Sequence, residues 1–194
     1  MEGQGGWGAL EAPCGAGAES VSSVVRIGAA LLRGFVRSLL EGAPGPPRPV
    51  LPAELGDAEP GDAVDGPPLA LLRDAALRVW ARLSRDPEMD SLVGALAGRP
   101  ALPALAEVSE ELFRSGINWG RVVVFFYFTY RVVLQVLQGS EPLRTVLDWA
   151  VSFLARRLAA WVQGQGGWGS ILSYSPPEQS QPPCAGGAPG SPEK

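Results

Sequence analysis

Gly120 and Arg121 are the residues of this sequence best suited to chemistry, and that chemistry is recognition rather than catalysis. A glycine in the first turn of a helix lets a second helix approach closely, because no Cβ stands between them. The neighbouring guanidinium offers a planar fork of donors to a carboxylate on that second helix. Apolar side chains from surrounding helices would complete a groove for an amphipathic helix, which is a common mode of peptide recognition.

A purely structural interpretation of the same region stays open. In that interpretation Arg121 caps the end of a nearby helix, and Trp119, Trp161 and Trp168 are simply core side chains. The aromatic run at 125–130 is expected to be core under either interpretation, because it belongs to a helix that is apolar on nearly every side.

The composition argues against an enzyme. The chain contains no histidine, which removes the usual base for serine and cysteine nucleophiles and the commonest metal ligand. Cys14 and Cys184 lie in Gly/Pro-rich ends without metal-ligand spacing. We therefore expect no catalytic residue, metal, cofactor or small-molecule substrate. The formal charge of −4 also argues against nucleic acid as a partner, since phosphate binding needs a basic surface.

The segment at about 118–138 is predicted to be the central helix. Asn118 can cap its start and Gly139 ends it. A helix that is apolar all round must lie among other helices or in a membrane. Arg131 in its middle opposes insertion, since a charge at the bilayer centre costs about 3 kcal/mol. We expect it to be buried in a soluble bundle.

The remaining apolar periodicity predicts further helices around this one. Their expected ranges are 20–40, 67–85, 87–98, 103–116 and 142–163, with a short helical turn at 168–174. The predicted fold class is therefore all-α, a helical bundle around a central hydrophobic helix, in a domain covering 20–175. We expect disordered tails at 1–19 and 176–194 and a flexible loop at 42–68, because these stretches are rich in Gly and Pro and lack periodicity.

Two motifs at a defined spacing give this helical order a family resemblance. The first is Asn118-Trp119-Gly120-Arg121-Val122-Val123, and the second is Trp161-Val162-Gln163-Gly164-Gln165-Gly166-Gly167-Trp168. With both motifs, the chain resembles the Bcl-2 family of apoptosis regulators, and in particular its Bax-like, pore-forming branch. The resemblance covers roughly residues 20–174.

The resemblance implies a Bcl-2-like helical bundle that binds amphipathic death-motif helices in a groove. The partners would be other Bcl-2 family proteins, in homo- or heterodimers. On activation the protein would permeabilise the mitochondrial outer membrane, so it would be cytoplasmic and conditionally associated with that membrane. The implied groove residues are Asn118, Trp119, Gly120, Arg121, Trp161, Gly167 and Trp168.

Two departures from the family pattern support an alternative function. Trp80 and Ala81 stand where the family's death motif has a small residue and an aspartate, and a bulky tryptophan opposes docking against Gly120. The polar, Pro-rich end at 176–194 is also expected to contain no tail anchor. The alternative is a soluble groove-type interaction module, or decoy, that modulates other family members without forming pores. The degenerate death-motif helix keeps an apolar ladder at Leu72, Ala76, Val79 and Leu83.

Overall fold

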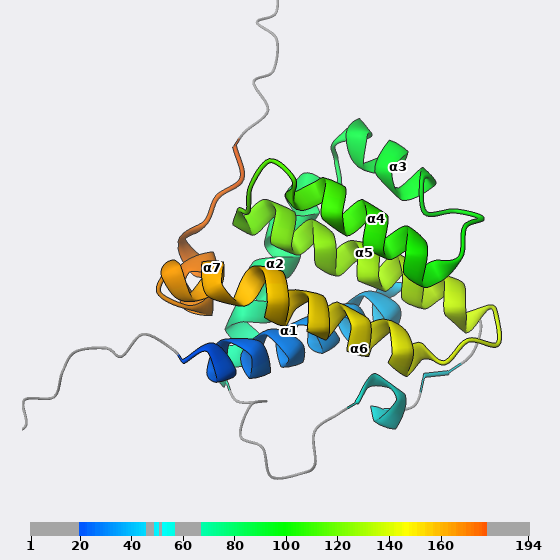
Figure 1. The fold of residues 1–194 in the computed structure, drawn as a ribbon, viewed down its shortest axis with the longest axis horizontal. Helices are drawn as coiled ribbons and strands as arrows, with labels where there is room; N and C mark the ends of the chain where they lie inside the picture. Colours follow the sequence, from blue (N-terminus) through cyan, green and yellow to red (C-terminus); the bar gives the residue numbers. More distant parts are fainter. Residues whose placement is uncertain (1–19, 46–48, 51, 57–66, 178–194) are drawn as a thin grey trace, which may run out of the picture.

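The computed structural model describes residues 20–45, 49–50, 52–56 and 67–177. In this part of the chain every regular element is helical, which confirms the predicted fold class (Figure 1). The elements are α1 (Val21–Gly42), the 3-10 turn η1 (Pro52–Leu55), α2 (Pro67–Leu83), α3 (Pro87–Gly94), α4 (Ala101–Phe113), α5 (Trp119–Leu137), α6 (Leu143–Phe153), the π turn η3 (Leu154–Leu158), α7 (Ala159–Gly164) and the 3-10 turn η4 (Trp168–Ser173).

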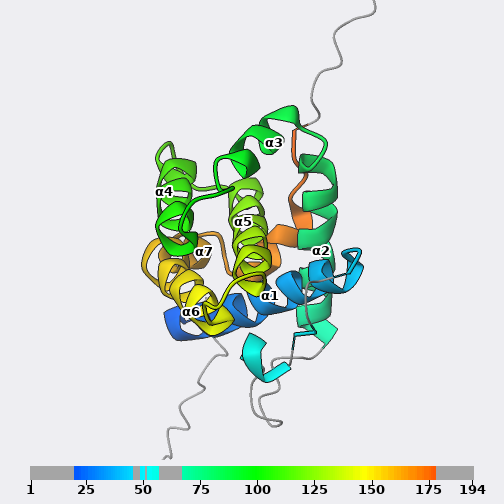
Figure 2. The same cartoon turned by 90° about the vertical axis from the view of Figure 1, so that its right-hand side faces the viewer.

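Helix α5 lies at the centre of the bundle, in contact with α1, α2, α4 and α6 (Figure 2). Fourteen of its nineteen residues are buried, and the rings of Phe125 and Phe126 are fully inaccessible. The buried hydroxyl of Thr129 donates to the carbonyl oxygen of Phe125 at 3.0 Å, so it is not left without a partner. Arg131 is exposed at the surface of the bundle. The helix is therefore a buried core element, as the sequence predicted.

Length and composition alone would also allow α5 to cross a membrane, and it is the one helix of the described residues that passes this test. At a rise of 1.5 Å per residue it is about 28 Å long, close to the thickness of a bilayer core. The core helices of soluble proteins pass the same test, and 72% of the apolar window of α5 is buried inside the bundle.

Side-chain caps fix the starts of three helices. Ser20 caps α1, and Oδ1 of Asp86 caps α3 by accepting from the backbone N–H of Glu88 at 2.9 Å. Asn118 caps α5. Each cap satisfies a backbone donor that has no partner within its own helix. The cap at Asn118 is the one that the sequence analysis predicts.

Several helix bounds differ from the prediction, and α3, for example, ends at Gly94 rather than at 98. Helix α4 begins at Ala101 rather than at Pro103, because proline is tolerated in a first turn, where its missing N–H has no intrahelical partner. The segment predicted as one helix over 142–163 widens into a π turn at Leu154–Leu158. Apolar spacing could not reveal the π turn. Leu154 and Leu158 are both fully buried, and residues four apart would also lie on one buried face of a regular α-helix.

The loop predicted as flexible at 42–68 is only partly described. Within it, η1 contacts α6, and Leu55 is 3% exposed and belongs to the core. The apolar stretch around Leu55 is short and interrupted by prolines, so it shows no periodicity from which this anchor could be predicted. The predicted N-terminal tail at 1–19 and residues 178–194 of the predicted C-terminal tail lie outside the described residues, while Pro176 is buried.

The packing of α1 against η4 depends on Gly28. A Cβ at this position would lie 2.6 Å from Cζ2 of Trp168, which is fully buried and confined by its neighbours. We expect Gly28→Ala to lower the free energy of unfolding by about 1–3 kcal/mol in urea denaturation. Gly34→Ala in the same helix is the matched control, because its Cβ would meet only the flexible Arg73 side chain at 3.4 Å. Its stability should hold or rise by up to about 1 kcal/mol, and equal losses in both variants would contradict this account.

Candidate partner-binding groove

The first motif is built around the start of α5. The Oδ1 of Asn118 accepts a hydrogen bond from the backbone N–H of Arg121 at 2.8 Å. The Nη1 of Arg121 in turn donates to the carbonyl oxygen of Gly116 at 2.7 Å. Gly116 has a φ of +119°, which L side chains rarely adopt, and it turns the chain from α4 into α5. The guanidinium thus closes this turn while remaining partly accessible at the surface.

Gly120 is already approached by the protein's own chain. A Cβ there would lie 2.8 Å from the hydroxyl oxygen of Tyr174 and 3.7 Å from Cδ1 of Leu83. Tyr174 follows η4, and Leu83 is the last residue of α2. Gly120 is therefore a point of close approach, and in this form of the protein the approaching groups are intramolecular.

The three tryptophans of the two motifs form one aromatic cluster where α5 meets α7 and η4. Trp119 packs edge-on against Trp161, with ring centroids 4.9 Å apart and an interplanar angle of 68°. The centroid of Trp119 also lies 5.6 Å from that of Trp168. The Nε1–H of Trp168 donates to the carbonyl oxygen of Val24 in α1 at 2.8 Å. Gly167, with a φ of +98°, makes the turn that places Trp168 in the core.

An open cavity of about 800 Å³ lies between α3, α4 and α5. Its walls are largely apolar and include Leu92 of α3, Leu112 of α4 and Phe128 of α5. Arg121 lines the same cavity from the first turn of α5. Arg114 and three glutamates of α4 also line it. The volume and the few charged groups among apolar walls are typical of a site that takes the apolar face of a ligand and fixes its orientation.

The carboxylates of α4 that line the cavity are paired with arginines. The pairs lie at N···O distances of 2.5, 3.1 and 3.0 Å and are solvent-accessible, so each contributes about 0–1 kcal/mol to stability. Arg121, in contrast, bonds to a carbonyl and to no carboxylate in the described part of the chain. The three pairs are Arg99–Glu107, Arg157–Glu110 and Arg114–Glu111.

The apolar ladder of α2 faces the bundle's own core. This helix contacts α1, α5 and η4. Three ladder side chains are buried, and the fourth is partly buried beside Gly120. In the closed bundle the ladder therefore acts as packing surface. Its members are, in chain order, Leu72, Ala76, Val79 and Leu83.

Trp80 fixes α2 on the central helix. Its ring stacks on that of Tyr127, with centroids 3.7 Å apart and an interplanar angle of 18°. Such a pair contributes about 0.5–1.5 kcal/mol beyond the area that it buries. The bulky residue that departs from the family pattern thus has a structural role here, while Ala81 beside it is exposed.

Among the seven groove residues predicted from the sequence, Arg121 lines the cavity. Asn118 and Gly120 lie at the start of α5, and the others lie in or next to the tryptophan cluster. The sequence did not reveal the cavity walls at Leu92 and Leu112, because apolar residues on a helix face are expected to be core unless a neighbour is missing. One signal was available in the sequence, namely the shortness of the helix predicted at 87–98.

Comparison with known proteins decides the family. The chain is 34% identical over 171 residues to apoptosis regulator BAX of Bos taurus, covering 86% of this chain and 84% of that protein. The chain belongs to the Bcl-2 family. The Homo sapiens BAX is likewise 34% identical over 170 residues, with the same shares covered. A sequence profile described as apoptosis regulator proteins of the Bcl-2 family matches residues 76–168, which include both motifs.

The fold of this Bcl-2 family protein is also that of a solved relative. The crystal structure of chicken BOK aligns with a TM-score of 0.58, covering 80% of this chain and 97% of that chain at 19% identity. By its similarity to BAX, this is a Bax-like apoptosis regulator of the Bcl-2 family. Membership implies interaction with other proteins of the family, whose regulators are not in general enzymes.

The indole of Trp168 is expected to be structural in this family member. Trp168→Phe would lose the buried hydrogen bond to Val24 and leave space in the core, lowering the free energy of unfolding by about 1–3 kcal/mol in urea denaturation. The control is Trp161→Phe, since Trp161 is only partly buried. A loss at Trp161 equal to or larger than the loss at Trp168 would contradict this assignment.

Proposed function

We propose that this protein regulates apoptosis by holding an amphipathic death-motif helix of another Bcl-2 family protein in the cavity between α3, α4 and α5. The observation that carries the proposal is the position of Arg121, which lines an apolar cavity and has no carboxylate partner in the described chain. A partner helix would lay its apolar face on Leu92, Leu112 and Phe128. An aspartate on that helix would accept a charge-assisted hydrogen bond from the guanidinium.

Docking close to Gly120 requires a local rearrangement. The hydroxyl of Tyr174 occupies the space that a partner backbone would need beside this glycine. The partner helix would therefore displace Tyr174, or bind further along the cavity. Helix α3 can shift at low cost, because none of its residues is fully buried.

We further propose that activation releases α5 and the segment α6–α7 from the core to permeabilise the mitochondrial outer membrane. The length and apolar composition of α5 support this step, as does the similarity to BAX over most of both chains. The closed form would be cytoplasmic, with its apolar helix covered, and would associate with the membrane only when the bundle opens.

A second candidate function is a soluble groove module, or decoy, that modulates other family members without forming pores. It is favoured by Trp80, which stacks on Tyr127 at 3.7 Å and fixes α2 to α5. Opening the bundle would have to break this contact. The absence of an acidic residue at Ala81 would also weaken α2 as a death motif for a second copy.

Removing the guanidinium should weaken helix binding. We expect Arg121→Ala to raise the Kd for a fluorescent death-motif peptide roughly 10- to 100-fold, the range for a lost charge-assisted hydrogen bond. Fluorescence anisotropy measures the Kd. The matched control is Arg144→Ala, an exposed arginine of α6 that does not line the cavity. Equal affinities in both variants, with unchanged urea unfolding, would overturn the groove assignment.

Dye release from liposomes separates the two candidate functions. The purified protein is mixed with dye-loaded anionic liposomes, with and without the death-motif peptide. Peptide-dependent release is the expected result, because binding would free α5 from the core. Background release in a tube where anisotropy confirms peptide binding would instead establish the soluble module. Neither binding nor release would contradict both functions.

A further inference from the structure

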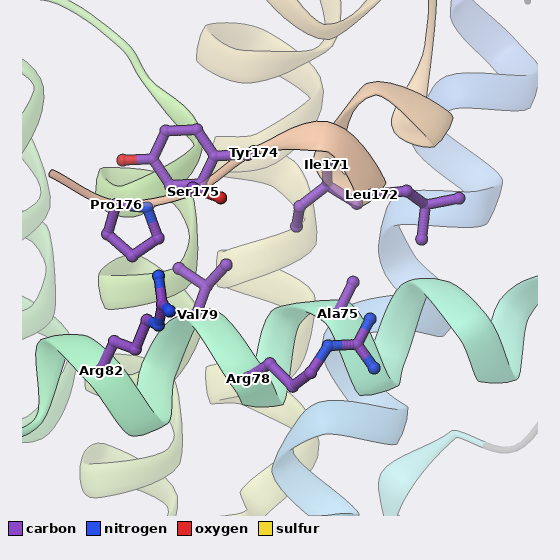
Figure 3. A pocket seen from close by; sticks show the side chains of 9 residues that line it. All are labelled: Ala75, Arg78, Val79, Arg82, Ile171, Leu172, Tyr174, Ser175 and Pro176. Carbon is purple, nitrogen blue, oxygen red and sulfur yellow. The ribbon is translucent and has the colours of Figure 1, made fainter. Parts of the chain in front are cut away.

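A second cleft, of about 260 Å³, lies between α2 and the chain that leaves η4 (Figure 3). Arg78 and Arg82 project into it from α2, one helical turn apart, and Ser175 and Pro176 lie on the opposite wall. The cleft shares no lining residue with the cavity between α3, α4 and α5. It is therefore a separate cleft, and the one lining residue that the proposed helix binding involves is Tyr174.

The two guanidiniums of this cleft lack anionic partners. Both residues are exposed, and no ion pair or hydrogen bond joins the guanidinium of Arg78 or Arg82 to another group of the described chain. Like charges at i, i+4 on a helix oppose folding by a few tenths of a kcal/mol. An anion bridging them would remove that repulsion, and the planar guanidinium matches the oxygens of a phosphate group.

Exposed leucines flank the arginine pair. Leu172 lines the cleft and is 49% exposed, and Leu71 of α2 is 57% exposed. Leu71, Arg78 and Arg82 stand at i, i+7 and i+11, which places them along one side of the helix. Among the described residues, these leucines are two of the three large apolar side chains that are exposed. Apolar side chains beside arginines are typical of surfaces that lie in a membrane interface.

We propose that the surface formed by Leu71, Arg78, Arg82 and Leu172 binds the headgroups of anionic phospholipids while the bundle is closed. The arginines would hold phosphate oxygens, and the leucines would enter the boundary between headgroups and acyl chains. The whole chain carries a formal charge of −4, so an anionic membrane would repel most of its surface. A local cationic surface would therefore set the orientation in which the closed protein meets the membrane.

Vesicle flotation tests the proposal on the full chain. Phosphatidylcholine vesicles, with or without phosphatidylserine, are mixed with the protein, and the bound fraction is measured across lipid concentrations. We expect binding only with phosphatidylserine, weakened by salt. The double variant Arg78→Gln/Arg82→Gln should lose about 30-fold in apparent affinity, from about 1 kcal/mol for each arginine near an anionic surface.

A matched double variant keeps the test specific. Arg131→Gln/Arg144→Gln removes the same charge from two exposed arginines of α5 and α6 that lie outside the cleft. It should bind like the parent protein, and urea unfolding should be the same for all three proteins. Equal losses in both double variants, or equal binding to vesicles of phosphatidylcholine alone, would overturn the proposal.

Two further outcomes would also overturn it in favour of another occupant. Saturable binding of inorganic phosphate that depends on Arg78 and Arg82, with no vesicle binding, would make the cleft a site for a soluble anion. Self-association that depends on the same arginines, again without vesicle binding, would make it an interface between two copies. None of these readouts uses the death-motif peptide or dye release, so failure here is distinguishable from failure of the proposed function.

Discussion

The burial of most of α5 is the constraint on which the rest of the structure depends. A helix that is apolar over most of its circumference leaves little surface for water, so α1, α2, α4 and α6 must surround it. Their close approach sets local requirements elsewhere, such as the missing side chain at Gly28 under the ring of Trp168. Because the packing is dense, none of these contacts can be changed alone without moving its neighbours.

Core packing and the lining of the cavity meet within one motif at the start of α5. Trp119 packs into the tryptophan cluster, while Arg121, two residues later, reaches the cavity beside α3 and α4. The cap at Asn118 fixes the phase of the helix and so determines which of these side chains points inward. The cavity proposed as the groove is thus positioned by the core, and α3, with no fully buried residue, is its least constrained wall.

Helix α2 uses its two faces differently. Its apolar ladder and Trp80 bind it to the bundle, so exposing the ladder would break contacts with α1, α5 and η4 together. Its outer side carries Arg78 and Arg82, whose guanidiniums form no ion pair with a described carboxylate. One helix can carry both surfaces, because the inner and outer positions differ in helical phase. The inner surface stabilises the closed form, and the outer surface is the one proposed to bind an anionic partner.

The sequence by itself determined the all-α class, the central helix, its cap at Asn118 and the family, since these follow from local periodicity and from motifs within short segments. It did not determine the π turn at 154–158, the burial of Leu55 or the walls of the cavity. Only the tertiary structure decided whether an apolar side chain such as Leu112 meets a neighbour or an open space. It also decided that Tyr174 lies beside Gly120, because that contact joins residues far apart in the chain and depends on how η4 packs.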